Sequence, residues 1–182
     1  QNVHFYPTNK FRITIDKENI IKNKVVNPKD YDSIVPYIDL DIKDRALYKN
    51  RIMMLDVIAN NNWKRPVYFT GGSFGDDDYL WMKDYLQLDG LVYKLVPVKT
   101  TIDREYSIEM GQIDTDKMYD LVSKWQWGNG DKTTIYHDPE TRKNSISYRT
   151  NMSRLANQLI KESKKEKAKI IIDQALSKMP ID

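Results

Sequence analysis

Two aspartates have a spacing that could do chemistry. Asp39 and Asp41 alternate with Ile38, Leu40 and Ile42, so both carboxylates lie on one face of a predicted strand. Paired carboxylates can act as general acid and base or bind a cation. The alternative, which we favour, is the solvated face of an edge strand, where like charges prevent mispairing.

A second acidic group, Asp76, Asp77 and Asp78, follows the glycine-rich stretch 71–75. This stretch lacks the P-loop lysine and the dinucleotide-binding spacing, and the aspartates would repel a phosphate. Clustered carboxylate oxygens could instead hold a hard cation such as calcium. We favour simple helix capping, in which aspartates satisfy the free amides of the helix that follows. The sequence therefore predicts no catalytic residue, no metal site and no cofactor.

Aromatic residues form a third group of candidates. Tyr79, Trp81 and Tyr85 share one short predicted helix, and Trp125 and Trp127 flank a turn. Such rings can stack on the faces of sugars, which would make a glycan a ligand. Because Trp and Tyr are mostly buried in folded domains, we favour a role in the core.

Composition limits the class of protein. The 182 residues include 29 Lys and Arg, 26 Asp and Glu, no Cys and 40% hydrophobic residues, enough for a packed core without disulfides. The longest uncharged stretch, 66–75, is far shorter than the about 20 apolar residues of a membrane-spanning helix. The basic surplus lies in residues 149–182, and the rest lacks the Lys/Arg clustering of nucleic-acid binding, so no nucleic-acid partner is expected. Because the chain starts at Gln1 rather than Met, we expect a mature protein or an excised piece.

The apolar periodicity predicts an α/β (or α+β) fold. It consists of a small mixed sheet with flanking helices, followed by a C-terminal tetratricopeptide-like helical hairpin. We expect strands at 11–15, 38–42, 67–70 and 91–98, and helices at 46–60, at 79–87 and after a cap within 114–116. Alternating helices and strands suggest parallel strands with crossover helices. Residues 142–148 fit a strand or a helix equally well. We divide the chain into an α/β domain, 1–148, and a helix pair, 149–182, packed on it or continuing a repeat array.

The C-terminal segment has the spacing of a tetratricopeptide repeat. Small and apolar residues occupy the repeat positions, with a closing proline: Met152, Leu155, Ala156, Leu159, Ala168, Ile172, Ala175 and Pro180. One repeat cannot bury its own hydrophobic face, so it must pack on another domain, further repeats or a partner chain. Grooves of such hairpins usually hold a peptide or protein, which predicts a protein or peptide partner.

Two longer stretches resemble one protein family. They are residues 53–69, MMLDVIANNNWKRPVYF, and residues 85–97, YLQLDGLVYKLVP. Both are similar to the soluble C-terminal part of large multispanning envelope proteins, common in Bacteroidetes, whose membrane part resembles protein O-mannosyltransferases. The resemblance runs from about Phe11 to the end of the chain. It implies a periplasm-facing domain that reaches the membrane only through its parent chain. It implies no catalytic residue here, because the acidic groups of such transferases lie in loops of the spanning region.

We therefore expect a non-catalytic accessory or interaction domain of a glycosyltransferase-like membrane protein in the cell envelope. It would bind a protein partner or an acceptor substrate. The alternative is a carbohydrate-binding or glycan-processing domain that uses clustered carboxylates and exposed aromatics. Carboxyl groups about 5 to 9.5 Å apart in a cleft lined by Trp81 or Trp127 would favour that alternative. The sequence leaves open whether the parent protein is itself an active transferase.

Overall fold

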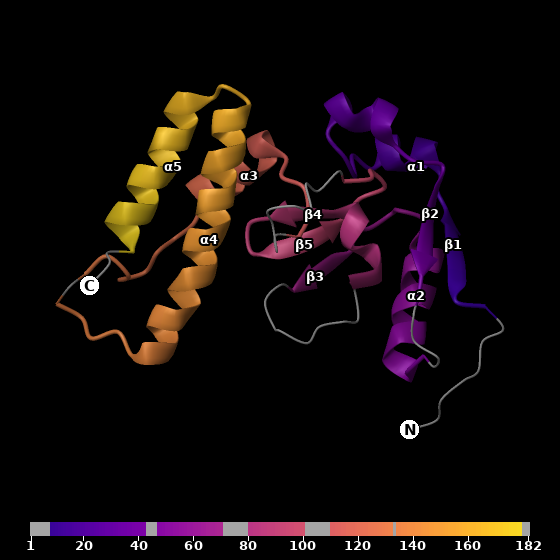
Figure 1. The fold of residues 1–182 in the computed structure, drawn as a ribbon, viewed down its shortest axis with the longest axis horizontal. Helices are drawn as coiled ribbons and strands as arrows, with labels where there is room; N and C mark the ends of the chain where they lie inside the picture. Colours follow the sequence, from indigo (N-terminus) through magenta and orange to yellow (C-terminus); the bar gives the residue numbers. More distant parts are fainter. Residues whose placement is uncertain (1–7, 43–46, 71–79, 101–109, 133, 180–182) are drawn as a thin grey trace. The chain divides into compact units, whose positions relative to one another are not determined.

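The computed structural model describes residues 8–42, 47–70, 80–100, 110–132 and 134–179. The fold is mixed α/β, with two small antiparallel sheets, several helices and a C-terminal helical hairpin, which confirms the predicted class (Figure 1). The chain forms two compact units. The first comprises residues 1–87 and 93–112, and the second comprises residues 88–92 and 113–182.

The first sheet is a pair of antiparallel strands, β1 (Lys10–Thr14) and β2 (Tyr37–Asp41). Side chains alternate along both strands as predicted, because successive residues of a strand point to opposite faces. Phe11 lies opposite Leu40 in the register, and both face the core. The charged residues that alternate with them along the two strands face outward. The polar and apolar faces of this sheet are therefore set directly by the sequence pattern.

Helical segments complete the first unit around this sheet. Their bounds are α1 (Lys17–Lys22), η1 (Pro28–Ser33), α2 (Lys49–Asn61) and η2 (Leu80–Tyr85), of which η1 and η2 are 3₁₀ helices. Helix α2 starts three residues later than predicted and ends at Asn61, and its C-cap Asn62 adopts the left-handed conformation with φ 45°. The fully buried side chains Ile20, Ile38 and Met82 join these elements into one core.

The second sheet corrects the predicted topology. Its strand order is β3 (Tyr68–Thr70), β5 (Val92–Leu95) and β4 (Leu86–Asp89), and its strands are antiparallel, so the expected parallel arrangement is wrong. The segment expected to be a crossover helix is instead the six-residue η2 followed by β4. Only Gly90 and Leu91 connect β4 to β5, and Gly90 has φ 68°. A two-residue connection can join only antiparallel strands.

The second unit contains three helices, α3 (Thr115–Ser123), α4 (Pro139–Lys161) and α5 (Lys165–Lys178). A cap was predicted within 114–116, and Asp114 provides it: its side chain accepts hydrogen bonds from two backbone N–H groups of the first turn of α3. Residues 142–148, which fitted strand or helix, belong to α4. The predicted division at residue 148 falls within this helix, and a separate C-terminal domain stays a prediction.

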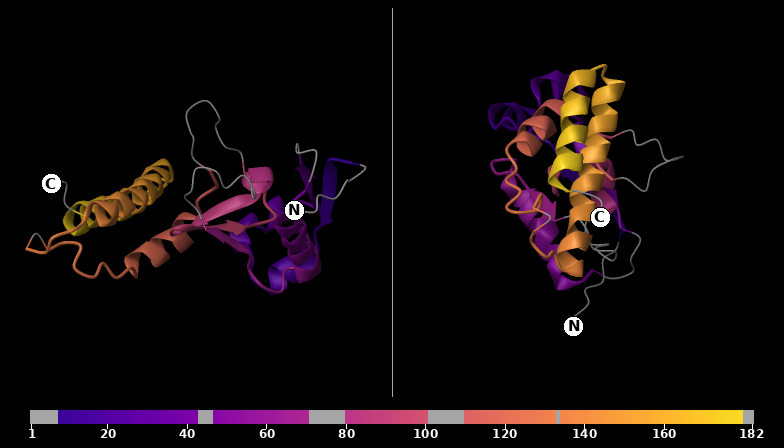
Figure 2. Two further views of the ribbon diagram at one scale, coloured as in Figure 1. Left: turned by 90° about the horizontal axis from the view of Figure 1, so that it is seen from below. Right: turned by 90° about the vertical axis from the view of Figure 1, so that its left-hand side faces the viewer.

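A three-residue connection joins α4 to α5, which lie side by side in Figures 1 and 2. Its geometry is a Schellman motif: the Lys164 N–H donates to the Leu159 carbonyl at 2.8 Å, and the Ser163 N–H donates to Ile160 at 2.9 Å. Ser163 adopts φ 62°, the left-handed region in which glycine is normally preferred. The tight turn therefore includes a residue with a steric cost.

Replacing Ser163 with glycine should relieve that cost. We expect S163G to raise the free energy of unfolding by about 0.5 to 1 kcal/mol, since a left-handed side chain costs more than the entropy that glycine loses on folding. Urea denaturation followed by far-ultraviolet circular dichroism measures the change. The matched control is S147G on the exposed part of α4, which should lower stability by about 0.5 kcal/mol. A loss of stability in S163G would contradict the assigned turn geometry.

Candidate functional site

A groove of about 260 Å³ lies between α4 and α5. Helix α4 contributes one side and α5 the other: Arg149, Met152, Ser153, Ala156 and Asn157, then Ile171, Ile172, Ala175 and Leu176. Pockets for small-molecule ligands begin at about 300 Å³ and enclose most of the ligand. The volume of this groove lies close to the lower limit of that range.

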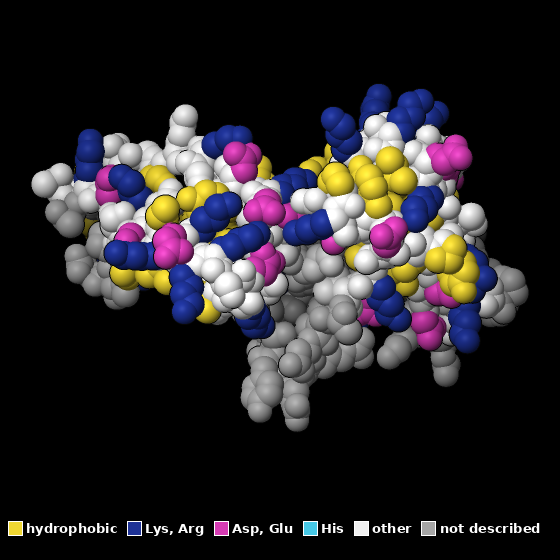
Figure 3. Space-filling model, turned by 90° about the horizontal axis from the view of Figure 1, so that it is seen from above, with side chains coloured by type: hydrophobic (Ala, Val, Ile, Leu, Met, Phe, Trp, Pro, Cys, Tyr) yellow, Lys and Arg dark blue, Asp and Glu magenta, His cyan; other side chains and the backbone are white. Residues whose placement is uncertain are grey.

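The groove has a buried apolar floor and exposed apolar rims. Met152, Ala156 and Ile171 are almost fully buried, whereas Ile172 is 42% exposed and Leu176 is 58% exposed. On the face of the described residues drawn in Figure 3, apolar side chains lie among Lys, Arg, Asp and Glu side chains. Water thus contacts aliphatic surface that a partner could cover.

Most residues of the predicted repeat signature lie where α4 and α5 meet. Five of them are buried: Met152, Leu155, Ala156, Leu159 and Ala168. Ile172 instead lies on the rim, because Ile171, three residues after Ala168, takes the position that faces α4. Ala175 is half-buried, and Pro180 lies outside the described residues.

Arg149 is the one charged residue that lines this groove, and it is not among the residues predicted from the sequence. Its Nε atom is buried and has no hydrogen-bond partner within residues 134–179 or elsewhere in the described chain. Buried guanidinium nitrogens are normally paired, since each unpaired donor forfeits its hydration. The sequence signal that could have identified Arg149 is its position, one helical turn before Met152 and beside the apolar stripe.

A polar network fixes the end of the hairpin to α3. The Thr115 hydroxyl donates to Glu162 at 2.6 Å, and the Lys164 ammonium donates to Thr115 at 2.9 Å and to Asp116 at 3.0 Å. Lys164 also forms a 2.9 Å ion pair with Glu162. Burial alone would raise the pKa of Glu162, but hydrogen bonds from Thr115, Lys164 and Gln158 outweigh it and lower that pKa. The charged network thus supports the helices that form the groove.

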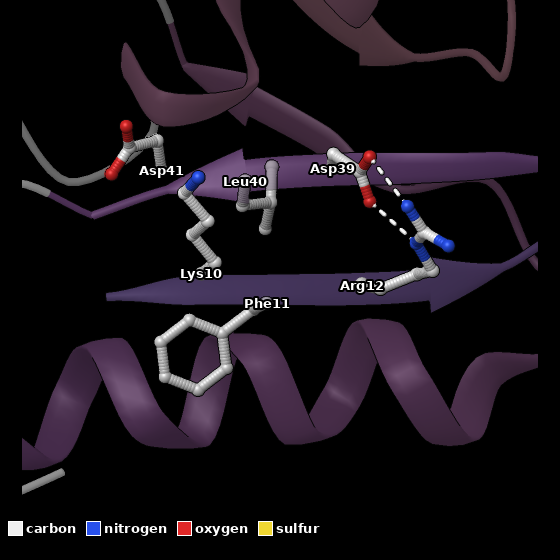
Figure 4. A pocket seen from close by; sticks show the side chains of 6 residues that line it. All are labelled: Lys10, Phe11, Arg12, Asp39, Leu40 and Asp41. Atoms are coloured by element: carbon white, nitrogen blue, oxygen red, sulfur yellow. Dashed lines mark hydrogen bonds and ion pairs between the residues drawn. The ribbon is translucent and has the colours of Figure 1, made fainter. Parts of the chain in front are cut away.

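The predicted carboxylate pair lies on the outer face of the first sheet, beside a shallow pocket of about 300 Å³ (Figure 4). Arg12 donates two hydrogen bonds to Asp39, at 2.7 and 2.9 Å, and lies 3.7 Å from the ring centroid of Tyr37. Lys10 is opposite Asp41 in the register. The side-chain hydrogen bond from Arg12 is the main cause that lowers the pKa of Asp39.

This arrangement fits cross-strand charge pairing. A general acid needs a raised pKa, and Asp39 has a lowered one. The backbone N–H groups of Ile42 and Ile15 donate hydrogen bonds to the carbonyls of Asn9 and Pro36. Because hydrogen-bonded and non-hydrogen-bonded pairs alternate along antiparallel strands, Arg12 and Asp39 form a non-hydrogen-bonded pair. Side chains approach most closely at such pairs, which explains why opposite charges occur there.

Tyr79 lies outside the described residues, and the other predicted aromatic residues are divided between the two units. In the first, Tyr85 is 8% exposed, and its hydroxyl accepts a hydrogen bond from the Asp39 backbone N–H. Trp81 is half-buried, with the Arg51 guanidinium 5.3 Å from its ring centroid. Tyr85 thus covers the edge of β2, where its ring cannot stack on a ligand.

In the second unit, Trp125 and Trp127 pack against each other and against Tyr148. The ring centroids of Trp125 and Trp127 are 5.6 Å apart, and the Tyr148 centroid lies 5.3 Å from that of Trp125 and 5.9 Å from that of Trp127. The rings are steeply inclined to one another. A Cβ atom on Gly90 would lie 3.4 Å from the Trp125 ring. These half-buried rings form a local packing cluster, and glycan binding by them stays a prediction.

Asp76, Asp77 and Asp78 lie outside the described residues. Among the residues that are described, no group of three His, Asp or Glu side chains is placed to hold a metal ion. Helix capping at 76–78 therefore stays a prediction, with calcium binding as its alternative.

The family model of the TMEM260-associated domain 2 matches residues 1–117. No curated protein and no solved structure matches the chain. Within the described ranges, no helix is long and apolar enough to cross a membrane. The family match includes the first unit and ends in α3, before both helices of the groove.

The polar network should make the stability of the second unit depend on acid pH. Folding lowers the pKa of Glu162 below its ordinary value of 4.5. The ionised side chain therefore contributes to the stability of the folded state above pH 4.5, and this contribution is lost as the pH falls through the pKa of Glu162 in the folded state. We expect E162Q to flatten the decline of the melting midpoint below about pH 5. The control is E140Q, whose side chain is 78% exposed and has only a 3.9 Å ion pair. An unchanged slope in E162Q would contradict this role.

The outer and inner faces of β2 should differ sharply in their tolerance of mutation. D39N removes an exposed ion pair and should lower the melting midpoint only slightly. L40A empties a position that is 1% exposed, and should cost about 2 to 5 kcal/mol. Thermal denaturation of both variants measures the difference. A loss in D39N as large as that in L40A would overturn the assignment of the polar face to solvent.

Proposed function

Because the chain belongs to the family of the TMEM260-associated domain 2, we propose that it is an accessory domain of a TMEM260-like membrane protein. We further propose that the parent has a membrane part similar to O-mannosyltransferases and that this domain faces the periplasm. The sequence resemblance at residues 53–69 and 85–97 supports both points. The domain's function in this proposal is interaction with a protein partner, without chemistry of its own.

The groove between α4 and α5 is the proposed contact surface. The exposure of Ile172 and Leu176 above a buried floor is the observation that carries the proposal. Burying one aliphatic side chain contributes about 1.5 to 3 kcal/mol, so covering both rims would supply a substantial part of a binding energy. Aliphatic anchors between two helices are typical of surfaces that accept a helix or peptide.

The pairing of Asp39 with Arg12 argues against a role for Asp39 as a general acid. Asp39 is held by Arg12, and its lowered pKa keeps it ionised. A carboxylate in that state cannot donate a proton to a leaving group near neutral pH. Among the other carboxylates that could serve glycan processing, Asp41 lies opposite Lys10 in the register, and 76–78 lie outside the described residues.

Site-specific photocrosslinking in the intact parent protein tests this proposal. A photoreactive amino acid at Leu176, on the groove rim, should give a discrete crosslinked product in cells. The same amino acid at Ile170, which is 52% exposed on α5 but does not line the groove, is the matched control. Equal products at the two positions, or none at Leu176, would contradict the assignment of the groove as the contact surface.

A further inference from the structure

We propose that the groove between α4 and α5 recognises an acidic amphipathic helix, with a carboxylate of the partner bound by Arg149. This inference rests on the proposed interaction function and specifies the chemistry of the partner. It combines three features of the groove: a guanidinium whose Nε has no partner among the described residues, an aliphatic floor and the positive charge of the surrounding segment.

Arg149 lies at one end of the groove, and the hydrogen bond that its Nε could donate is unused among the described residues. Its Nε is buried and unpaired among the described residues, so a ligand that accepts this hydrogen bond gains without breaking an existing one. A carboxylate is the best acceptor, because the planar guanidinium binds two carboxylate oxygens at once. The rest of the lining is aliphatic or uncharged, so the charge requirement is confined to one end.

The dimensions fit about two helical turns. From Arg149 to Asn157, α4 advances about 12 Å at 1.5 Å per residue. A partner helix with a carboxylate at one position and aliphatic side chains about four and seven residues later presents three anchors over a similar length. Leu176 and Arg149 lie at similar distances from the α4–α5 connection. Leu176 would therefore contact the part of the partner helix that carries the carboxylate and the first of its two aliphatic side chains.

The charge of the hairpin favours an acidic partner over a second copy of this chain. Residues 149–182 include eight basic and four acidic side chains. Two such segments facing each other would repel, whereas an acidic helix is attracted and its encounter is accelerated. The exposed apolar rims supply affinity, and the charge supplies selectivity and orientation.

A pair of designed helical peptides tests the proposal on the 182-residue chain. One peptide carries Glu, Leu and Leu at positions i, i+4 and i+7, and the other replaces the Glu with Gln. We expect the Glu peptide to bind at least about tenfold more tightly, in line with a hydrogen bond between charged groups. R149Q should weaken the Glu peptide by a similar factor and abolish the difference between the peptides, as a double-mutant cycle requires.

Control variants separate the anchor from the groove. K143Q removes an equal charge from α4 at a side chain that is 73% exposed, and should leave both affinities unchanged. L176S should weaken both peptides, whereas I170S, on the other face of α5, should weaken neither. Circular dichroism confirms that each variant is folded.

The possible results distinguish the two levels of the proposal. Equal binding of both peptides, lost in L176S, would overturn carboxylate recognition by Arg149 and leave the groove as an interaction surface. Binding that none of these groove variants changes would overturn the acidic-helix proposal, and crosslinking at Leu176 decides separately on the proposed function. A concentration-dependent dimer in sedimentation velocity, abolished by L176S, would show that a second copy occupies the groove and would also overturn the acidic-helix proposal.

Discussion

Two helices joined as a hairpin can bury only the stripes along which they touch, and the second unit is built around this constraint. Met152, Leu155 and Ile171 fill the contact between α4 and α5. The adjacent stripe, with Ile172 and Leu176, has no described element over it and remains open to water. The groove is thus a direct result of pairing two helices whose apolar stripes are wider than their contact.

The position of α3 depends on one corner of the hairpin. Thr115 begins α3, and Glu162 and Lys164 end α4 and precede α5, so three helix ends meet in one polar network. Helix ends leave backbone groups without partners, and the Asp114 cap and the Schellman motif satisfy several of them here. The network adds side-chain pairs that individually are modest and together fix the relative placement of these helices.

Local physics made much of this fold predictable. The alternation in β1 and β2 and the Asp114 cap follow from neighbouring residues alone, and the structure has both. The parallel topology was wrong because η2 and β4 share a segment whose apolar pattern also fits one helix. Arg149 and the partner of Asp39 could not be selected, since each depends on which distant side chains approach it. Pairing across the fold is information that a single sequence pattern does not contain.

The contrast between the two kinds of pairing in this chain has a kinetic consequence. Residues 15–36 separate β1 from β2, whereas three residues separate α4 from α5. Local helical contacts form in microseconds, while pairing strands across a longer segment must first overcome the entropy of closing the loop. We therefore expect the hairpin to assemble early in folding and the first sheet to form later. During refolding of the complete chain, partly folded molecules would then already present the groove.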